Sequence, residues 1–342
     1  MRIAILADVH GNLAALHAVV EELERVDPAP DHIVVNGDLI NGTPLSSEVI
    51  DYIRKQDWIV VRGNHEFYYL DYGTERAPAD YEDAMRWGQL HWLIEQITFE
   101  QGSYLALLPD ERTFYIPNTE PIRIAHGVPG NNRIGFAPHQ PSEEIVPKIS
   151  HVPENVLITA HSHVQFDRYI LTDFDRSDDG NETRSASIDA RNPSRHGRFF
   201  DTLNHQISLA NLWWHLINPG SVGLPLNGNI NAQFVLLDSH SRQRYPDGWK
   251  ASHCQVPYDR RPVLDSFHSS GMLQAGGTIS LLFYWELCTA EPEIIHFYRW
   301  AIKNGYQPDA DMTKTFHAYV NATGRDSYVK EQDPCHDGPT TI

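Results

Sequence analysis

Short apolar runs recur through the first 165 residues, and a cluster of polar side chains follows each of them. The runs have the length of buried strands, and amphipathic segments at helical spacing lie between several of them; they cover residues 3–7, 33–36, 58–61, 122–125 and 156–159. Alternating strands and helices predict a layered α/β fold. Such folds bind ligands at the carboxyl ends of their strands, so we expect the polar clusters to meet at one edge.

The polar clusters carry residue types that bind metal ions. Carboxylate, amide and imidazole groups suit Mn, Fe, Zn and similar ions. The clusters are Asp8-Val9-His10, Gly37-Asp38, Gly63-Asn64-His65-Glu66, His126-Gly127 and Ala160-His161-Ser162-His163. Seven ligand side chains are too many for one ion, whereas a bridging carboxylate lets such a set hold two ions about 3.5–4 Å apart. The seven are Asp8, His10, Asp38, Asn64, His126, His161 and His163.

Two pairs of these candidates are separated by a single residue: Asp8 with His10, and His161 with His163. At an extended strand end, this spacing points both side chains to the same side. We therefore expect extended backbone to bring each pair together.

The charge balance and the cysteines restrict partners and location. Asp and Glu outnumber Lys and Arg by 45 to 27, a net charge of −18. Such a surface repels long polyanions, which disfavours a nucleic-acid polymer as partner. The three cysteines form no CxxC pair, which fits a reducing compartment. The apolar run at residues 3–7 is too short for a signal peptide or a membrane helix, so we expect a cytoplasmic protein without membrane attachment.

The order of the motifs resembles that of the calcineurin-like metallophosphoesterases, and most closely their YfcE-type bacterial branch. Residues 218–223 (NPGSVG) and 256–259 (VPYD) agree with this, so the resemblance covers residues 1–259 apart from a polar stretch. It implies a four-layer α/β/β/α sandwich with a dimetal site at one edge. One ion would take Asp8, His10, Asp38 and His163, and the other Asp38, Asn64, His126 and His161. Ala160 stands where the family usually has Gly.

The resemblance also implies a reaction. Two divalent ions, Mn favoured and Fe, Zn, Ni or Mg as alternatives, would generate a bridging hydroxide that attacks phosphorus. Asp38 would take part as the shared ligand. His65 would donate a proton to the leaving alcohol or stabilise the transition state. Asn12 and Arg133 are candidates for contact with the phosphate, although Asn also caps helices and Arg is usually solvated.

Three functions remain open at this point. The first is a phosphodiesterase for a small or nucleotide-like diester, and the second is a phosphomonoesterase, including a protein phosphatase, that uses the same site. The third is a binding scaffold that has lost catalysis, which is disfavoured because all seven ligands and His65 are present. The expected partner is a small phosphoester substrate, and a homo-oligomer is not excluded.

The chain divides into a core and an extension. We expect a metallophosphoesterase core over residues 1–258, interrupted by a polar insertion at about 172–211, and a C-terminal extension over 259–342. Residues 80–108 are expected to form one long helical stretch. Strand–helix alternation is lost after residue 258, but residues 281–287 and 294–302 are apolar or aromatic and should pack. The extension would cap the site or form a subunit contact.

Overall fold

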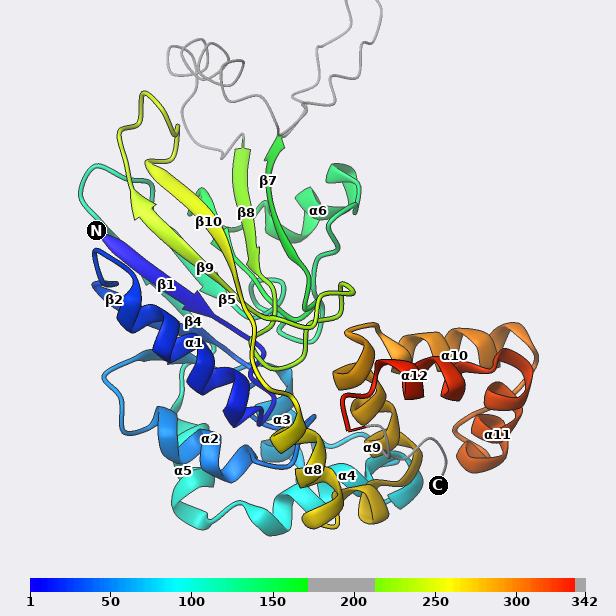
Figure 1. The fold of residues 1–342 in the computed structure, drawn as a ribbon. Helices are drawn as coiled ribbons and strands as arrows, with labels where there is room; N and C mark the ends of the chain where they lie inside the picture. Colours follow the sequence, from blue (N-terminus) through cyan, green and yellow to red (C-terminus); the bar gives the residue numbers. More distant parts are fainter. Residues whose placement is uncertain (172–212, 336–342) are drawn as a thin grey trace, which may run out of the picture.

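A computed structural model describes residues 1–171 and 213–335 of the chain (Figure 1). The insertion expected at residues 172–211 lies outside the described residues. Two five-stranded sheets face each other, and helices cover their outer faces. The four-layer α/β/β/α architecture expected from the sequence is therefore confirmed.

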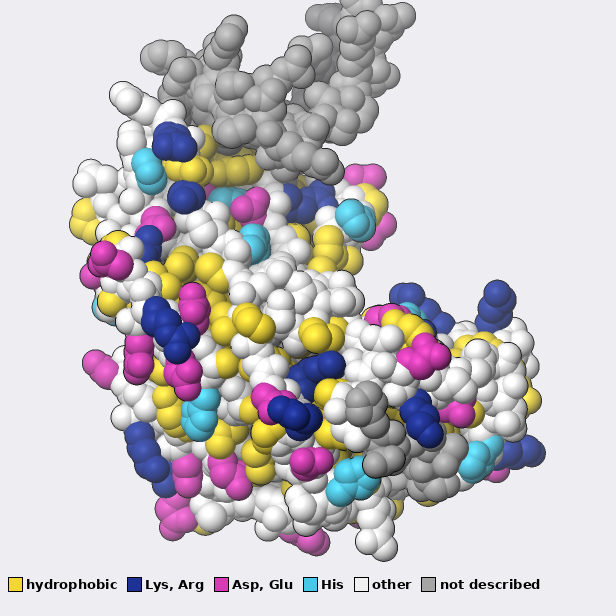
Figure 2. Space-filling view, in the orientation of Figure 1, with side chains coloured by type: hydrophobic (Ala, Val, Ile, Leu, Met, Phe, Trp, Pro, Cys, Tyr) yellow, Lys and Arg dark blue, Asp and Glu magenta, His cyan; other side chains and the backbone are white. Residues whose placement is uncertain are grey.

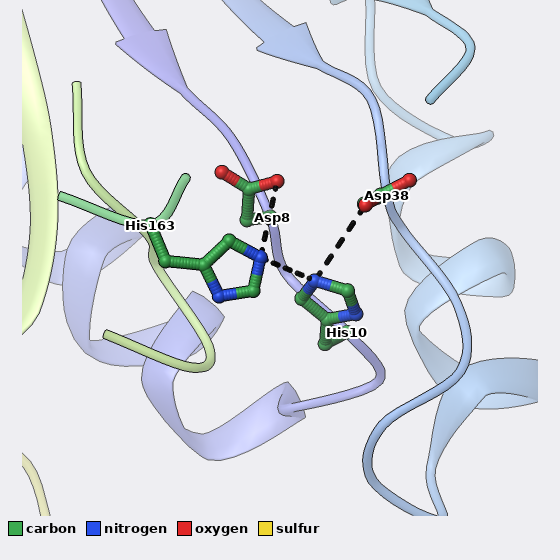
Figure 3. A group of neighbouring side chains, drawn as sticks. All are labelled: Asp8, His10, Asp38 and His163. Carbon is green, nitrogen blue, oxygen red and sulfur yellow. Dashed lines mark hydrogen bonds and ion pairs between the residues drawn. The ribbon is translucent and has the colours of Figure 1, made fainter. Parts of the chain in front are cut away.

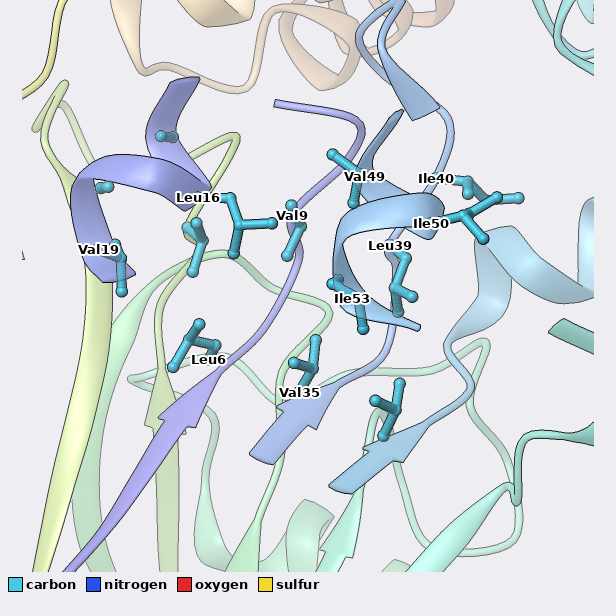
Figure 4. Packing of buried hydrophobic residues seen from close by; sticks show 14 of the residues in the cluster. Leu6, Val9, Leu16, Val19, Val35, Leu39, Ile40, Val49, Ile50 and Ile53 are labelled. Carbon is cyan, nitrogen blue, oxygen red and sulfur yellow. The ribbon is translucent and has the colours of Figure 1, made fainter. Parts of the chain in front are cut away.

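The first sheet has the order β10-β9-β1-β2-β3. Strands β1 (Arg2–Leu6), β2 (His32–Asn36) and β3 (Ile59–Val61) are parallel to one another. Strand β9 (Ala232–Ser239) pairs antiparallel with both β1 and β10 (Trp249–Val256). Helices α1 (Leu13–Arg25) and α2 (Ser46–Ile53) lie on its outer face. Figure 4 shows Leu16 and Val19 of α1 and Ile53 of α2 directed at Leu6 and Val35 of the sheet. Apolar residues spaced three and four apart thus give each helix one buried face.

The second sheet has the order β4-β5-β6-β8-β7. Its strands are β4 (Glu111–Phe114), β5 (Ile122–Ala125), β6 (Val156–Ile158), β7 (Gln165–Leu171) and β8 (Trp213–Pro219). Helix α6 (Ser142–Ile149) covers its outer face with Ile145 and Ile149. Between the two sheets, Ile5 and Val34 of the first pack in one buried cluster with Ile124 and Ile158 of the second. This packing brings the carboxyl ends of five strands to one edge.

The helical stretch expected over residues 80–108 is in fact two helices, α4 (Ala84–Gln96) and α5 (Phe99–Leu107). The break falls at Thr98, whose hydroxyl accepts a hydrogen bond from the Gln101 backbone N–H while the Gln101 side chain accepts from the Thr98 N–H. This capping box starts a new helix where the hydrophobic periodicity alone shows none. A further helix, α3 (Asn64–Asp71), begins directly after β3.

The C-terminal part of the described chain is helical, and its helices pack on one another and on α4 (Figure 1). They are α8 (Arg261–Ser269), α9 (Met272–Thr289), α10 (Glu293–Lys303), α11 (Met312–Thr323) and α12 (Arg325–Gln332). Their shared interior is rich in aromatic side chains, including Phe267, Trp285, Phe297 and Phe316. The region therefore packs as expected, while its status as a separate domain stays a prediction.

The contact between α4 and α9 depends on glycine. A Cβ atom at Gly88 of α4 would lie 2.5 Å from the carbonyl oxygen of Ala275 in α9. No larger residue fits there without moving one helix. Glycine at this position therefore allows the two backbones to approach closely.

The described surface mixes charges of both signs. On the face shown in Figure 2, acidic side chains are scattered over α1, α2 and α8, with basic side chains between them. In the described ranges, no helix has the length and apolar character that crossing a membrane requires.

Candidate metal centre

All seven predicted ligands come together at the edge where β1, β2, β3, β5 and β6 end. At this edge, two groups of side chains each have ligand atoms that lie within 4.8 Å of one another. The first is Asp8, His10, Asp38 and His163 (Figure 3), and the second is Asp38, His126 and His161. Asn64 joins the second group, because its Oδ1 lies 2.9 Å from His126 Nε2 and 2.7 Å from His161 Nδ1. Asp38 belongs to both groups.

Left-handed backbone, rather than extended backbone, brings the closely spaced ligands together. Among the described residues other than glycine, eight have positive φ, and five of them are predicted ligands: Asp8, His10, Asp38, His161 and His163, with φ between 50° and 66°. The expectation of an extended strand end at these pairs is therefore wrong, because β1 ends at Leu6 and β6 ends at Ile158. Such conformations are unfavourable for residues with a Cβ and concentrate at functional sites.

Backbone carbonyl groups orient the two imidazoles of the first group. His10 Nδ1 lies 2.5 Å from the Asn41 oxygen, and His163 Nδ1 lies 2.6 Å from the Leu224 oxygen. A carbonyl can only accept, so each Nδ1 carries the proton and each Nε2 presents a lone pair. These two Nε2 atoms lie 3.1 Å apart (Figure 3). Two facing lone pairs repel unless a cation lies beside them, which fits a metal site.

The second group shows the same arrangement. His126 Nδ1 lies 2.9 Å from the Asn36 carbonyl oxygen, and its Nε2 is directed at Asn64 Oδ1, 2.9 Å away, and at Asp38 Oδ2, 3.2 Å away. Asp8 gives further support for a metal site. Both of its carboxylate oxygens are buried and have no hydrogen-bond partner among the described residues. An unpartnered buried carboxylate surrounded by imidazoles is the donor set expected of a cation ligand.

His65 lies against both groups. It occupies the first turn of α3, where its backbone N–H donates to Asp38 Oδ1 over 2.8 Å. Its ring packs edge-on against His10, with the centroids 4.7 Å apart, and its Nε2 lies 3.9 Å from Asp38 Oδ2. Its Nδ1 is buried without a partner among the described residues. The predicted catalytic side chain is therefore within reach of anything bound at the centre, while its role stays a prediction.

Residues 1–165 match the family model of the calcineurin-like phosphoesterases. This part of the chain is a calcineurin-like phosphoesterase domain. The resemblance drawn from the motif order is therefore confirmed. The family is metal-dependent, and the buried Asp/His groups supply the residues that could hold the metal.

Known proteins resemble this chain in fold and, over a shorter stretch, in sequence. A metallophosphoesterase from Sphaerobacter thermophilus is 22% identical with a TM-score of 0.53, over 81% of this chain and 100% of that one. A hypothetical protein from Pyrococcus horikoshii OT3 is 19% identical with a TM-score of 0.59, over 83% and 97%. A curated relative, the symmetrical bis(5′-nucleosyl)-tetraphosphatase of Methylococcus capsulatus (strain Bath), is 30% identical over 119 residues. That match spans 30% of this chain and 41% of the relative's length.

Burial and nearby charges shift the pKa values of the groups in the metal centre in opposite directions. Burial raises the pKa of Asp8 well above its usual range, although His126 opposes the shift. Burial acts the same way on Asp38, but His126 and His65 outweigh it and hold its pKa well below the usual range. Burial would lower the pKa of His126, and the Asp38 carboxylate instead raises it to about 10. Burial lowers the pKa of His65 to about 3 and that of His161 to about 4. The ionised Asp38 therefore favours the protonated form of His126, while His65 and His161 stay neutral.

Glu66 fixes the geometry of the phosphoesterase centre without being among the predicted site residues. Its Oε2 accepts from the Gly63 N–H at 2.7 Å and the Asp38 N–H at 3.0 Å, and its Oε1 accepts from the Leu39 N–H at 2.7 Å. One buried carboxylate therefore ties the loop after β2 to the loop after β3. Burial raises its pKa to about 7. Its position at the end of the motif Gly63-Asn64-His65-Glu66 is the sequence feature from which this role could have been predicted.

The two residues predicted to contact the phosphate, Asn12 and Arg133, bind other residues of the protein. Asn12 is buried, its Oδ1 accepts from the Ala15 N–H as the cap of α1, and its Nδ2 donates to the Gly223 carbonyl and to the Tyr258 hydroxyl. The Arg133 guanidinium pairs with Asp71 at 2.7 Å and lies over the Tyr68 ring. Contact of either residue with substrate stays a prediction.

Proposed function

We propose that this phosphoesterase is a dinuclear metal-dependent phosphodiesterase that hydrolyses a small or nucleotide-like phosphodiester. The observation that carries the proposal is the sharing of Asp38 between two ligand groups. A carboxylate common to two sites is the arrangement that two-metal hydrolases use to hold ions about 3.5–4 Å apart.

The two ligand groups divide between two divalent ions, with Mn favoured because oxygen and imidazole ligands are present without thiolate. Asp8, His10, Asp38 and His163 would hold one ion, and Asp38, Asn64, His126 and His161 the other. The bound ions would supply an activated water and neutralise charge on the phosphoryl oxygens. We assign Asp38 the bridging position, which its burial and low pKa support.

His65 would act on the leaving group. Its ring borders both ligand groups, and its unpartnered Nδ1 leaves one nitrogen free to hydrogen-bond with an oxygen of the substrate. Assistance of this kind helps most when the leaving alkoxide is poor, as in an alkyl diester. The presence of His65 therefore supports a diester over an activated monoester.

The substrate class is proposed from charge and from the curated relative. That relative is named for a bis(5′-nucleosyl) tetraphosphate, which supports a nucleotide-like substrate here. The net charge of −18 supports a small substrate rather than a nucleic-acid polymer. We place the enzyme in the cytoplasm because its cysteines fit a reducing compartment.

The test is hydrolysis of an aryl phosphodiester beside the matching monoester by metal-stripped protein with and without added Mn²⁺. We expect diester turnover that requires Mn²⁺ and falls in His65→Ala and Asp38→Asn. Asp57→Asn, which removes an exposed carboxylate, is the matched control and should retain the wild-type rate. Faster monoester turnover would contradict the phosphodiesterase and establish a phosphatase. Binding of ions without turnover of either ester would indicate a scaffold.

A further inference from the structure

The two histidines of the first ligand group are oriented by loops that the C-terminal helices contact. His10 is held by the carbonyl of Asn41, and His163 by the carbonyl of Leu224. Partners of this kind set the ring orientation of a metal ligand, and losing one typically lowers metal affinity about 10–100-fold. What holds Asn41 and Leu224 therefore matters for the first ion.

A buried hydrogen-bond chain runs from α9 to the Asn41 loop. The Ser280 hydroxyl donates to Gln89 Oε1 at 2.8 Å, and Gln89 Nε2 donates to Asn41 Oδ1 at 2.9 Å. His10 then donates to the backbone oxygen of Asn41. Ser280 is fully buried, and Gln89 and Asn41 are 2% and 7% exposed. Water therefore cannot readily replace a missing member of the chain, and a lost partner leaves a buried polar group unsatisfied.

The Asn41 loop is a place where such support is needed. Asn41 has a φ of 63°, and the side chain of Gln89 is its contact from α4. A residue with a positive φ is held in that backbone conformation by its contacts with the surrounding structure. Loss of the Gln89 hydrogen bond would let the Asn41 carbonyl shift away from His10.

The second contact is made by Leu224, which follows β8. Its side chain is buried in the apolar interior of the C-terminal helices, together with Phe267 and Trp285. Its carbonyl oxygen accepts from His163 Nδ1. Four residues later, the Gly228 N–H donates to the carbonyl of Ala290 at the end of α9 over 2.8 Å. The C-terminal helices thus hold this loop in two ways, by burying the Leu224 side chain and by accepting the hydrogen bond from Gly228.

The second ligand group has no such connection among the described contacts. His126 Nδ1 is held by the Asn36 carbonyl, and His161 Nδ1 faces Asn64 Oδ1. The side chain of Asn36 donates in turn to the carbonyl of Ala125, between the two sheets. Both partners belong to the layered core.

We propose that the C-terminal helices position the ligands of one ion only, the ion held by Asp8, His10, Asp38 and His163. Ser280 and Gln89 are positioning residues that act through Asn41 on His10, and Leu224 acts on His163. The inference rests on the proposed dinuclear centre. It makes the first site dependent on the C-terminal helices and leaves the second site to the core.

The experiment compares Ser280→Ala with Thr278→Val in the full chain. Thr278 lies on the same helix, is equally buried, and its hydroxyl has no hydrogen-bond partner among the described residues. Mn²⁺ is titrated into metal-stripped protein by calorimetry, and Co²⁺ absorption reports the coordination of each site. Gln89→Met, which removes the middle of the chain at similar volume, is a second probe if Ser280→Ala does not fold by circular dichroism.

We expect Ser280→Ala to weaken one of the two binding steps about tenfold and to change the Co²⁺ spectrum of that step. In a His161→Ala background, which retains the first ligand group, Ser280→Ala should weaken the remaining step. In a His163→Ala background it should change nothing, and Thr278→Val should be silent throughout.

Equal weakening of both steps, or unchanged binding, would overturn the proposal. A wild type that binds a single ion would contradict the dinuclear centre instead. The positioning inference is then decided by whether Ser280→Ala weakens that one step.

Discussion

The metal edge and the C-terminal helices are both buried, yet their interiors are opposite in character. At the metal edge, Asp8 and Asp38 are buried carboxylates on left-handed backbone. Among the C-terminal helices, Phe297 and Phe316 pack edge-to-face within an apolar cluster. The first region has buried charge that a bound cation would offset, and the second is held together by apolar packing. The two regions are therefore stabilised by different interactions.

Asp38→Asn tests the metal edge and should have the largest effect. Asp38 belongs to both ligand groups, so the change removes a charged ligand from each. We expect phosphoester hydrolysis to fall by at least about 10⁴-fold, more than about 5 kcal/mol of transition-state stabilisation. Turnover at saturating Mn²⁺ measures it. Activity within tenfold of wild type would show that Asp38 is not the shared ligand.

Phe297→Ala tests the C-terminal helices. The side chain is fully buried among Trp285, Phe316 and Tyr319 neighbours. Removing it should lower the free energy of unfolding by about 3–5 kcal/mol, through lost burial and the cavity left behind. Denaturant unfolding of the metal-stripped protein measures the change. Exposed Phe99→Ala is the control and should be close to neutral. A loss below 1 kcal/mol would show that this cluster contributes little to the stability of the fold.

The contrast also explains what could be predicted from the sequence. All seven candidate ligands and the layered core were predicted, because metal chemistry restricts each position to a few residue types and buried strands leave apolar runs. Glu66, Asn41 and Leu224 were not predicted in their roles. They act through backbone groups or through carboxylate contacts with backbone N–H groups, which many residue types could make. A backbone carbonyl that accepts a hydrogen bond, such as that of Leu224, cannot be recognised from the sequence.

The elements that were missed follow the same reasoning. Strand β4 is only partly buried along its length and has no apolar run, and β7 has a single buried residue, Ile170. Neither presents the pattern of a core strand. The helices α8–α12 have a clear apolar content but no motif, so the sequence predicted their packing without their arrangement.

Asp8→Asn sharpens the comparison, because its effect on the free energy of unfolding should have opposite signs with and without bound metal. In the metal-stripped protein, Asp8 is a buried carboxyl with no hydrogen-bond partner among the described residues. Replacing it with a neutral amide should raise the free energy of unfolding, by roughly 3 kcal/mol. With saturating Mn²⁺ the variant should be the less stable protein, because it lacks a ligand. Thermal unfolding with and without Mn²⁺ measures both. The same sign in both conditions would contradict a metal-ligand role.

Glu286 is a buried carboxyl group among the C-terminal helices and should show the smallest of these effects. It is 3% exposed on α9, and its Oε1 accepts from the Ile294 N–H at 3.2 Å. Burial raises its pKa from 4.5 to about 8, and the nearby Glu293 adds to the shift. Below about pH 4.5, folded and unfolded chains both hold the proton, so the group has no effect on stability. Between pH 4.5 and 8 the unfolded chain ionises while the folded chain does not, and stability falls as the pH rises.

Glu286→Gln removes this titration and keeps the acceptor for Ile294. We expect the variant to match wild type near pH 4.5 and to exceed it by about 2–3 kcal/mol at pH 6.5. Denaturant unfolding at a series of pH values measures the difference, with the exposed Glu331→Gln on α12 as the control. A constant difference across the range would mean that Glu286 is ionised in the folded protein and paired with a group that stabilises its charge. The C-terminal interior would then resemble the metal edge more closely than its packing suggests.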